Sequence, residues 1–374
     1  MNIVEQGLLN QSEPGTRRAL STFPTVTPLR DGTLLATYRV GTTKDCDDET
    51  VELRRSSDNG RTWGEPTSPF SSVVAGTRGS LKLAYITAMG GDHLMAALLW
   101  VDRETYPGKP LFDCETEGCL PMAVLLSDST DLGQSWSPCR VVPLPDDVGP
   151  PSLTSPILRL PSDDLAISIE TNKTYEDRSK WYQRVVYVYS TDQGRTWSAP
   201  VTVAQDPTGR IFNWDQRGAV CPDGRVVTFT WYYDSETASY LNIRRRISTD
   251  EGKTWTPPED LGVTDQASHP AMLPDGGVVL AWVDRYVTHS IRARFAPRVD
   301  APFLPETEVV LYEHQAPTRA QAGPLADTSE ALADQGLWTF GLPYAEHLPN
   351  GDVMVVYYAG SSASMDIHWA RLSV

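Results

Sequence analysis

Two carboxylates stand in the sequence where acid–base chemistry could use them. Glu170 follows the apolar stretch 165–169, and a charge at the end of such a strand is costly unless it faces a polar space. Asp215 lies in the polar and aromatic run 213–217, at the start of a later strand. Paired carboxylates can hydrolyse a glycosidic bond, one as acid or base and the other as nucleophile or base. The structural alternative for each is an ion pair with an arginine such as Arg217.

Other titratable and charged residues are expected near the same strand ends. Asp284 and Asp47, the latter within the acidic run 45–49, are further candidates for catalysis. His269 could be a general base or bind substrate, although a buried, hydrogen-bonded histidine is the alternative. The guanidinium groups that could bind the carboxylate of an acidic sugar, or balance the charge of nearby acids, are those of Arg39, Arg217 and Arg285.

Aromatic residues are interleaved with these charged residues, as suits carbohydrate binding. Aromatic rings stack on the apolar face of a sugar while polar groups bond its hydroxyls. The candidates for substrate binding are Trp214, Trp231, Tyr344 and Tyr357. Packing between strands is the alternative, because Trp231 ends one of three equivalent strands, the other two ending at Trp100 and Trp282.

A repeated turn positions these strands. The pattern Ser-x-Asp-x-Gly-x-(Thr/Ser)-Trp, here called the Asp box, occurs four times, at 56–63, 129–136, 190–197 and 248–255. Asp accepts hydrogen bonds from nearby backbone amides and Gly takes a positive φ, while Trp covers the gap between strands. The aspartates of the boxes are therefore expected to be structural.

A second repeat, an apolar strand, a tight turn and another apolar strand, occurs six times. Its turns are Asp31-Gly32, Gly91-Asp92, Asp163-Asp164, Asp223-Gly224, Asp275-Gly276 and Asn350-Gly351. The spacing predicts an all-β chain folded as one six-bladed β-propeller over residues 1–374, with four-stranded antiparallel blades. The blades are expected at roughly 20–75, 78–148, 150–206, 212–264, 266–312 and 338–374. The N-terminal run 3–10 (within 1–12) should supply the fourth strand of the last blade and cover its edge.

The Asp boxes, with Leu-x-Asp-Gly-x-Leu-Leu at 29–35 and Arg54-Arg55-Ser56 before the first box, resemble the sialidase superfamily over essentially the whole chain. The resemblance implies three arginines for the substrate carboxylate, a tyrosine nucleophile activated by a glutamate, and an aspartate acid/base.

This sequence departs from that pattern at several of the implied positions. Thr22 and Trp231 stand where two of the arginines would, and Leu342 stands where the tyrosine would. Arg39 and Tyr344 lie two residues from the second arginine position and the tyrosine position. An acidic partner is kept as Asp215, and the blade 1 loop keeps an acid among Asp45, Asp47 and Asp48. The implied enzyme is therefore sialidase-like but not an ordinary sialidase.

The composition disfavours several classes of binding partner. The formal net charge of −16 disfavours nucleic acid and anionic membrane surfaces, which need a cationic face. No cluster of metal ligands and no phosphate-binding glycine loop is present, so no metal or cofactor is expected. The N-terminus has no signal-peptide pattern and no long apolar stretch follows, which predicts a cytoplasmic chain unless a leader was removed. The five cysteines are expected as free thiols, with a Cys114–Cys119 bridge as the alternative.

Three functions remain open. The first is an exo-acting glycoside hydrolase acting on a terminal, possibly acidic sugar of an oligosaccharide or glycoconjugate. The second is a polysaccharide lyase in which His269 or a tyrosine removes a proton next to a uronate carboxylate. The third is a non-catalytic propeller that binds glycan or a protein partner. Two insertions, 104–121 and 313–338, could form lids over the site, and the second has a helix start signal at 329–333. The oligomeric state is left open.

Overall fold

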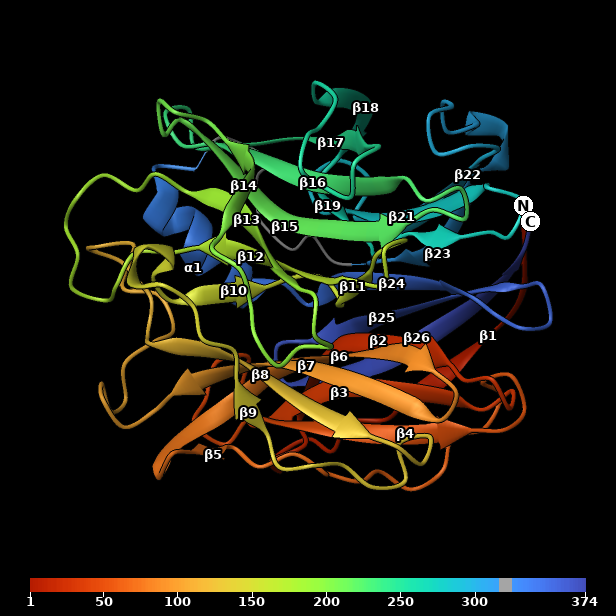
Figure 1. Cartoon of the computed structure of the whole chain (residues 1–374), viewed down its shortest axis with the longest axis horizontal. Coiled ribbons are helices and arrows are strands. Elements are labelled where there is room, and N and C mark those ends of the chain that lie inside the picture. Colours follow the sequence, from red (N-terminus) through yellow and green to blue (C-terminus); the bar gives the residue numbers. More distant parts are fainter. Residues whose placement is uncertain (316–324) are drawn as a thin grey trace.

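The computed structural model describes residues 1–315 and 325–374. Within this part of the chain nearly all regular structure is β, which confirms the predicted class (Figure 1). The exceptions are one helix, α1 (Thr328–Leu337), and two single 3-10 turns at Asp146–Val148 and Pro305–Thr307. The expected helix in the second insertion is therefore present. Its N-cap is Asp327, whose side chain accepts from Glu330 N.

The strands form five hydrogen-bonded sheets among the described residues. In the seven-stranded sheet the order is β24 (Phe340–His347), β25 (Val353–Ser361), β26 (Ser364–Ser373), β2 (Leu20–Pro28), β3 (Leu34–Gly41) and β4 (Thr50–Ser56), with β1 (Asn2–Asn10) on β26. The next sheet along the chain contains β5 (Val73–Val74), β6 (Thr77–Gly90), β7 (His93–Asp102), β8 (Met122–Ser129) and β9 (Arg140–Val141).

Three further sheets follow in chain order. The first has β10 (Pro151–Leu153) and β11 (Leu158–Arg159) on β12 (Leu165–Thr171), then β13 (Arg184–Ser190) and β14 (Val201–Gln205). The second is β15 (Ile211–Val220), β16 (Val226–Asp234), β17 (Ser239–Ser248) and β18 (Glu259–Thr264). The third has β19 (Gln266–Ala267) and β20 (Ala271–Met272) on β21 (Val278–Asp284), then β22 (Ser290–Ala296) and β23 (Val309–Glu313).

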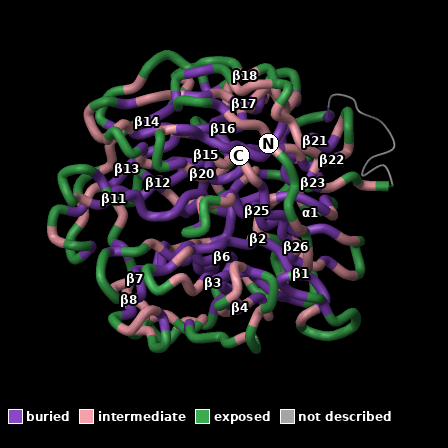
Figure 2. Tube along the Cα trace, turned by 90° about the vertical axis from the view of Figure 1, so that its right-hand side faces the viewer, coloured by how far each residue is buried: buried purple, intermediate pink, exposed green. Residues whose placement is uncertain are grey.

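The sheets have a propeller-like arrangement. In Figure 1 the colours run from the orange strands at the bottom through green at the top, and the blue strands return to lie beside the red and orange ones. The inner strands are buried, whereas exposed backbone lies mostly at the periphery (Figure 2). The two termini lie together because β1 pairs antiparallel with β26, from Asn2 opposite Ser373 to Asn10 opposite Ile367. The predicted pairing of the N-terminal run is therefore confirmed.

All four Asp boxes close in the same way. In the third box, Ser190 Oγ donates to Asp192 Oδ1 over 2.9 Å and accepts from Gly194 N over 2.8 Å, while Thr196 donates N–H and O–H to the same carboxylate. The other boxes repeat these contacts. The hydroxyl and amide donors lower the pKa of Asp192 to about 2. The boxes are thus stapled turns, as the sequence predicted.

Three inner strands carry a β-bulge at the same place. β2, β15 and β24 each lose register around one residue with positive φ: Phe23 (φ 52), Asp215 (φ 48) and Leu342 (φ 45). A bulge leaves the extra residue unpaired and redirects the side chains around it. Each bulge residue is partly exposed. The bulges therefore turn these residues out of the sheets at corresponding strand ends.

The closing strand gives a direct test of the packing. Leu9 is 2% exposed and packs in the hydrophobic core, whereas Leu8 is 45% exposed; the two lie at a register shift between Leu8 and Asn10. Leu9→Ala should lower the free energy of unfolding by about 2–5 kcal/mol, whereas Leu8→Ala should change it by less than about 1 kcal/mol. Chemical denaturation of both variants measures the difference. Equal losses would contradict the observed register.

Candidate functional site

Arg217 lies at the centre of a polar cluster where several sheets meet. It follows the bulge of β15 and is 3% exposed. Its Nη1 donates to Tyr85 Oη of β6 over 2.7 Å and to the Thr154 carbonyl over 2.5 Å, and its Nη2 donates to Asp215 Oδ1 over 3.2 Å. Burial disfavours the charged form of this guanidinium and so lowers its pKa. The interactions with Tyr85 and Asp215 outweigh burial, so the pKa of Arg217 is raised above its usual value. The guanidinium of Arg217 therefore links β15 to β6 and to the segment between β10 and β11.

Glu170 is the buried carboxyl of this cluster. It is the penultimate residue of β12 and is 6% exposed. Its Oε1 accepts from Thr154 Oγ1 and from Gln216 N, both over 2.9 Å. Burial, and then the charge of Asp215, raises the pKa of Glu170 to about 8. Glu170 therefore holds a proton at neutral pH, next to an Asp215 carboxylate that is ion-paired with Arg217.

The cluster continues from Asp215 to the sheet that begins with β19. Gln266 Nε2 donates to Asp215 Oδ2, and Gln266 Oε1 accepts from Arg285 Nη2 over 2.8 Å. Arg285 also donates to Asp265 Oδ2 over 3.0 Å and lies 3.7 Å from the ring centroid of Trp338. The two predicted arginines Arg217 and Arg285 thus belong to one hydrogen-bonded network.

A second cluster surrounds Glu49, which sequence reasoning did not single out. Arg39 Nη1 and Lys82 Nζ both contact Glu49 Oε1, at 2.6 and 2.7 Å, and Arg103 contacts Oε2 at 3.2 Å. Asp45 accepts from Lys82 and Arg103 as well. Three cations therefore share two acids. Lys82 interrupts an apolar strand between Leu81 and Leu83, the same signal that identified Glu170.

Lys44 joins the two clusters to the second insertion. Its Nζ donates to the carbonyls of Gln335 and Trp338 over 2.7 and 2.8 Å, at the end of α1. Burial, followed by the charges of Arg285 and Arg39, holds the pKa of Lys44 well below its usual range. Arg39 and Arg285 both act on the Lys44 ammonium, and the end of α1 with Trp338 lies against Lys44 and Arg285.

His269 and Tyr344 stack on each other near Arg217. Their rings stack at 4.5 Å between centroids and 14° between planes. Burial, followed by Arg217, lowers the pKa of His269 to about 3, so the imidazole is neutral. Burial raises the pKa of Tyr344 well above its usual value. His269 is buried, as the structural alternative expected, but within the described residues its buried Nδ1 has no hydrogen-bond partner. The hydrogen-bonded form of that alternative is therefore not observed, and the role of His269 as a base stays a prediction.

The remaining aromatic candidates contact other protein side chains. Trp214 stacks on Tyr233 at 4.6 Å, and Trp231 lies 5.6 Å from Trp338. Tyr357 is 3% exposed and donates to the Leu311 carbonyl over 3.1 Å. The rings of Trp214 and Trp231 form part of a buried aromatic cluster under α1. Sugar stacking by these three rings stays a prediction.

The hydrogen bonds and ion pairs of Asp284 and Asp47 are with residues other than Glu170 and Asp215. Asp284 accepts from the backbone N–H of Tyr286, Val287 and Thr288, which caps the loop after β21. Asp102 and Asp234 end β7 and β16 and cap the following loops in the same way. Asp47 is exposed and lies 3.9 Å from Arg103 Nε. The recurrence of the cap at three strand ends favours a structural role for Asp284.

The sequence expectation for the cysteines has a clear outcome. All five cysteines are free thiols, including Cys114 and Cys119, so the alternative bridge is not formed. Within residues 1–315 and 325–374, no group of three His, Cys, Asp or Glu side chains is placed to hold a metal ion. In the same ranges no helix has both the length and the apolar character needed to cross a membrane.

Comparisons with known proteins agree with this architecture. A family model described as BNR/Asp-box repeat matches residues 188–199 and 246–257, the third and fourth boxes. No curated protein matches the sequence significantly. A solved structure from Dyadobacter fermentans DSM 18053, described as of unknown function, is similar with a TM-score of 0.74 at 20% identity, covering 100% of this chain and 99% of that one.

Two similar structures are intramolecular trans-sialidases. The one from Ruminococcus gnavus, in complex with oseltamivir carboxylate, has a TM-score of 0.66 at 14% identity and covers 100% of this chain and 98% of that one. The one from leech has a TM-score of 0.64 at 13% identity, with coverage of 99% and 70%. At such identities the likeness shows the fold.

The loop-capping contacts of Asp284 lead to a stability prediction. Asp284→Ala leaves three backbone amides without their acceptor, which should lower the free energy of unfolding by about 1–3 kcal/mol. Asp47→Ala is the control, because an exposed carboxylate contributes within about 0.5 kcal/mol. Denaturation monitored by tryptophan fluorescence measures both. A loss at Asp47 as large as that at Asp284 would refute the assignment.

Proposed function

We propose that this chain, which has the fold and the Asp boxes of the sialidase-like superfamily, is an exo-acting glycoside hydrolase for a terminal sugar that carries an acidic group. The observation that carries the proposal is the pair Glu170 and Asp215. Both are carboxyls of one cluster, and their surroundings differ: Glu170 is buried with a pKa of about 8, whereas Asp215 is partly exposed and paired with Arg217. Environments that separate two carboxyls in this way set up an acid and its partner.

The roles follow from these environments. Glu170 donates its proton to the glycosidic oxygen as the bond from that oxygen to the terminal sugar breaks and the aglycone departs. Asp215, at the bulge of β15, meets the developing positive charge at the sugar as a carboxylate, acting as nucleophile or as base for water. Gln266 and Arg217 bind one oxygen each of Asp215. These two contacts hold the carboxylate in position without neutralising it by a proton.

The contacts of Arg39 support the proposal that the substrate carries an acidic group. Its Nη1 is engaged by Glu49 and the Lys44 carbonyl. Among the described residues no hydrogen-bond acceptor faces its buried Nε or Nη2. Buried donors without acceptors are costly, and a sugar carboxylate offers two acceptors in the geometry that a guanidinium prefers. The acidic group is therefore assigned to the Arg39 side of the site.

The scaffold of the proposal is a single closed domain of six blades. The seven-stranded sheet divides into β24-β25-β26-β1 and β2-β3-β4, joined only by the parallel pair Leu20 and Met365 in the described chain. An isolated bridge between Leu53 and Thr67 adds a fourth segment to the second group. Counted as two blades, this sheet brings the total to six, and corresponding strand ends then meet at one central site.

The direct test is turnover on aryl glycosides and acidic oligosaccharides, including sialosides and arabinosides. Glu170→Gln and Asp215→Asn should each lower kcat/KM by about 10²–10⁴. The loss in Glu170→Gln should shrink as the leaving phenol becomes more acidic, because such a group departs without a proton, whereas the loss in Asp215→Asn should not.

Asp234→Asn is the matched control, since Asp234 is a buried strand-end carboxylate that caps a loop. It should keep wild-type turnover per folded molecule. If no substrate turns over while glycan binding persists, the hydrolase is wrong and a binding propeller is supported. An unsaturated product that absorbs in the ultraviolet would instead identify a lyase.

The raised pKa of Glu170 predicts a pH limb. The active form carries the proton, so kcat/KM should fall as the pH rises through about 8. Glu170→Gln cannot titrate, so its residual activity should lack this limb. A pH–rate profile from pH 5 to 10 on one aryl glycoside measures it. A limb of unchanged position in the Gln variant would assign the titration to another group.

A further inference from the structure

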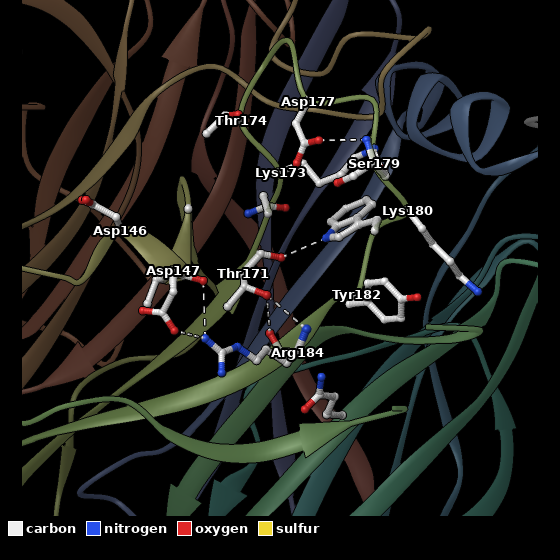
Figure 3. Close-up of a pocket in the computed structure, with 15 residues that line it drawn as sticks. Asp146, Asp147, Thr171, Lys173, Thr174, Asp177, Ser179, Lys180, Tyr182 and Arg184 are labelled. Atoms are coloured by element: carbon white, nitrogen blue, oxygen red, sulfur yellow. Dashed lines mark hydrogen bonds and ion pairs between the residues drawn. The ribbon is translucent and has the colours of Figure 1, made fainter. Parts of the chain in front are cut away.

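A separate pocket lies beside the proposed catalytic cluster (Figure 3). It has a volume of about 360 Å³ and is bounded by the turn at 146–149, the segment that follows β12, and Gln205 at the end of β14. Thr171 lines it, and the preceding residue of β12 is Glu170. The volume is within the range of small-molecule sites. The function proposed above makes no use of this pocket.

Tyr182 provides an aromatic surface in this pocket. It is 52% exposed and is the one large aromatic side chain that is exposed in residues 1–315 and 325–374. A Cβ placed on Gly209 would lie 2.9 Å from Tyr182 Cδ1, so the ring rests against a residue without a side chain. Lys180 Nζ lies 5.6 Å from the ring centroid. The ring is therefore braced by its neighbours while half of it stays open.

The formal charges of the side chains that line the pocket sum to zero. The cations Lys173, Lys180 and Arg184 are matched in number by the aspartates Asp146, Asp147 and Asp177. Arg184 binds Asp147 at 2.6 Å, and Figure 3 shows this ion pair at the pocket wall. Lys180 and Lys173 donate to backbone carbonyls, those of Thr208 and Ser179, both over 2.8 Å. A ligand here meets polar groups and a lining whose formal charges balance.

We propose that this pocket binds a neutral pyranose of a glycan, with the apolar face of the sugar on Tyr182 and its hydroxyls toward the surrounding polar groups. An open aromatic ring flanked by donors and acceptors suits such a ring, and the balanced charge gives an anionic sugar no advantage. The site is distinct from the Glu170–Asp215 pair. Its occupation does not require turnover.

Ligand-observed NMR with lactose, maltose and cellobiose tests the proposal. At least one of these neutral disaccharides should bind the wild-type chain, and Tyr182→Ala should weaken that binding about tenfold. Tyr182→Phe keeps the ring and should retain the affinity. Val287→Ala alters an exposed apolar residue outside the pocket and should change nothing. Circular dichroism establishes that each variant is folded.

Two further arms separate this proposal from the hydrolase. Glu170→Gln should bind the disaccharide like the wild type, so binding at Tyr182 can hold even if no substrate is ever turned over. A uronate-containing disaccharide should bind no more tightly than its neutral counterpart. Absence of binding by all three neutral sugars, or binding that survives Tyr182→Ala unchanged, would overturn the proposal, as would a Tyr182-dependent preference for the acidic sugar.

Discussion

The structure depends on one buried cation. Arg217 is held away from water by sheets on several sides, and a guanidinium in that position must be matched by acceptors. Its acceptors are the Tyr85 hydroxyl on β6, the Thr154 carbonyl between β10 and β11, and the Asp215 carboxylate on β15. Satisfying Arg217 therefore fixes how these segments meet, and it also pairs Asp215 with a guanidinium. A single interaction thus determines both the centre of the fold and the chemistry available there.

Around this cation the carboxyls are differentiated by burial. Glu170 receives two hydrogen bonds yet lies close to a second negative charge, and so keeps its proton. Asp215 stands on a bulge, where it reaches partial exposure. The end of α1 lies against this cluster, because Lys44 donates to the Trp338 carbonyl and Trp338 lies on Arg285. The Asp boxes close turns between strands. The bulges, the charged side chains and the end of α1 together form the candidate site at the strand ends.

The sequence predicted the regular parts of this molecule better than its centre. Asp boxes and hairpin turns are local, so their pattern is visible in eight residues, and Glu170 was visible as a charge in an apolar strand. The bulges at Phe23, Asp215 and Leu342 are not visible in this way, and each shifts the facing of the residues after it. Glu49, Lys82 and Gln266 join the arginines through contacts between separate chain segments, which the spacing of residues along one strand does not show.

The proton on Glu170 is the feature on which the proposed chemistry depends. Infrared difference spectroscopy of the wild-type chain against Glu170→Gln, from pH 5 to 10, observes that proton directly. The predicted result is a protonated-carboxyl band that is present at pH 6, is missing from the Gln variant, and disappears as the pH rises through about 8. A band that is already absent at pH 6 would mean that Glu170 is ionised there, and the assignment of acid and partner would fall with it.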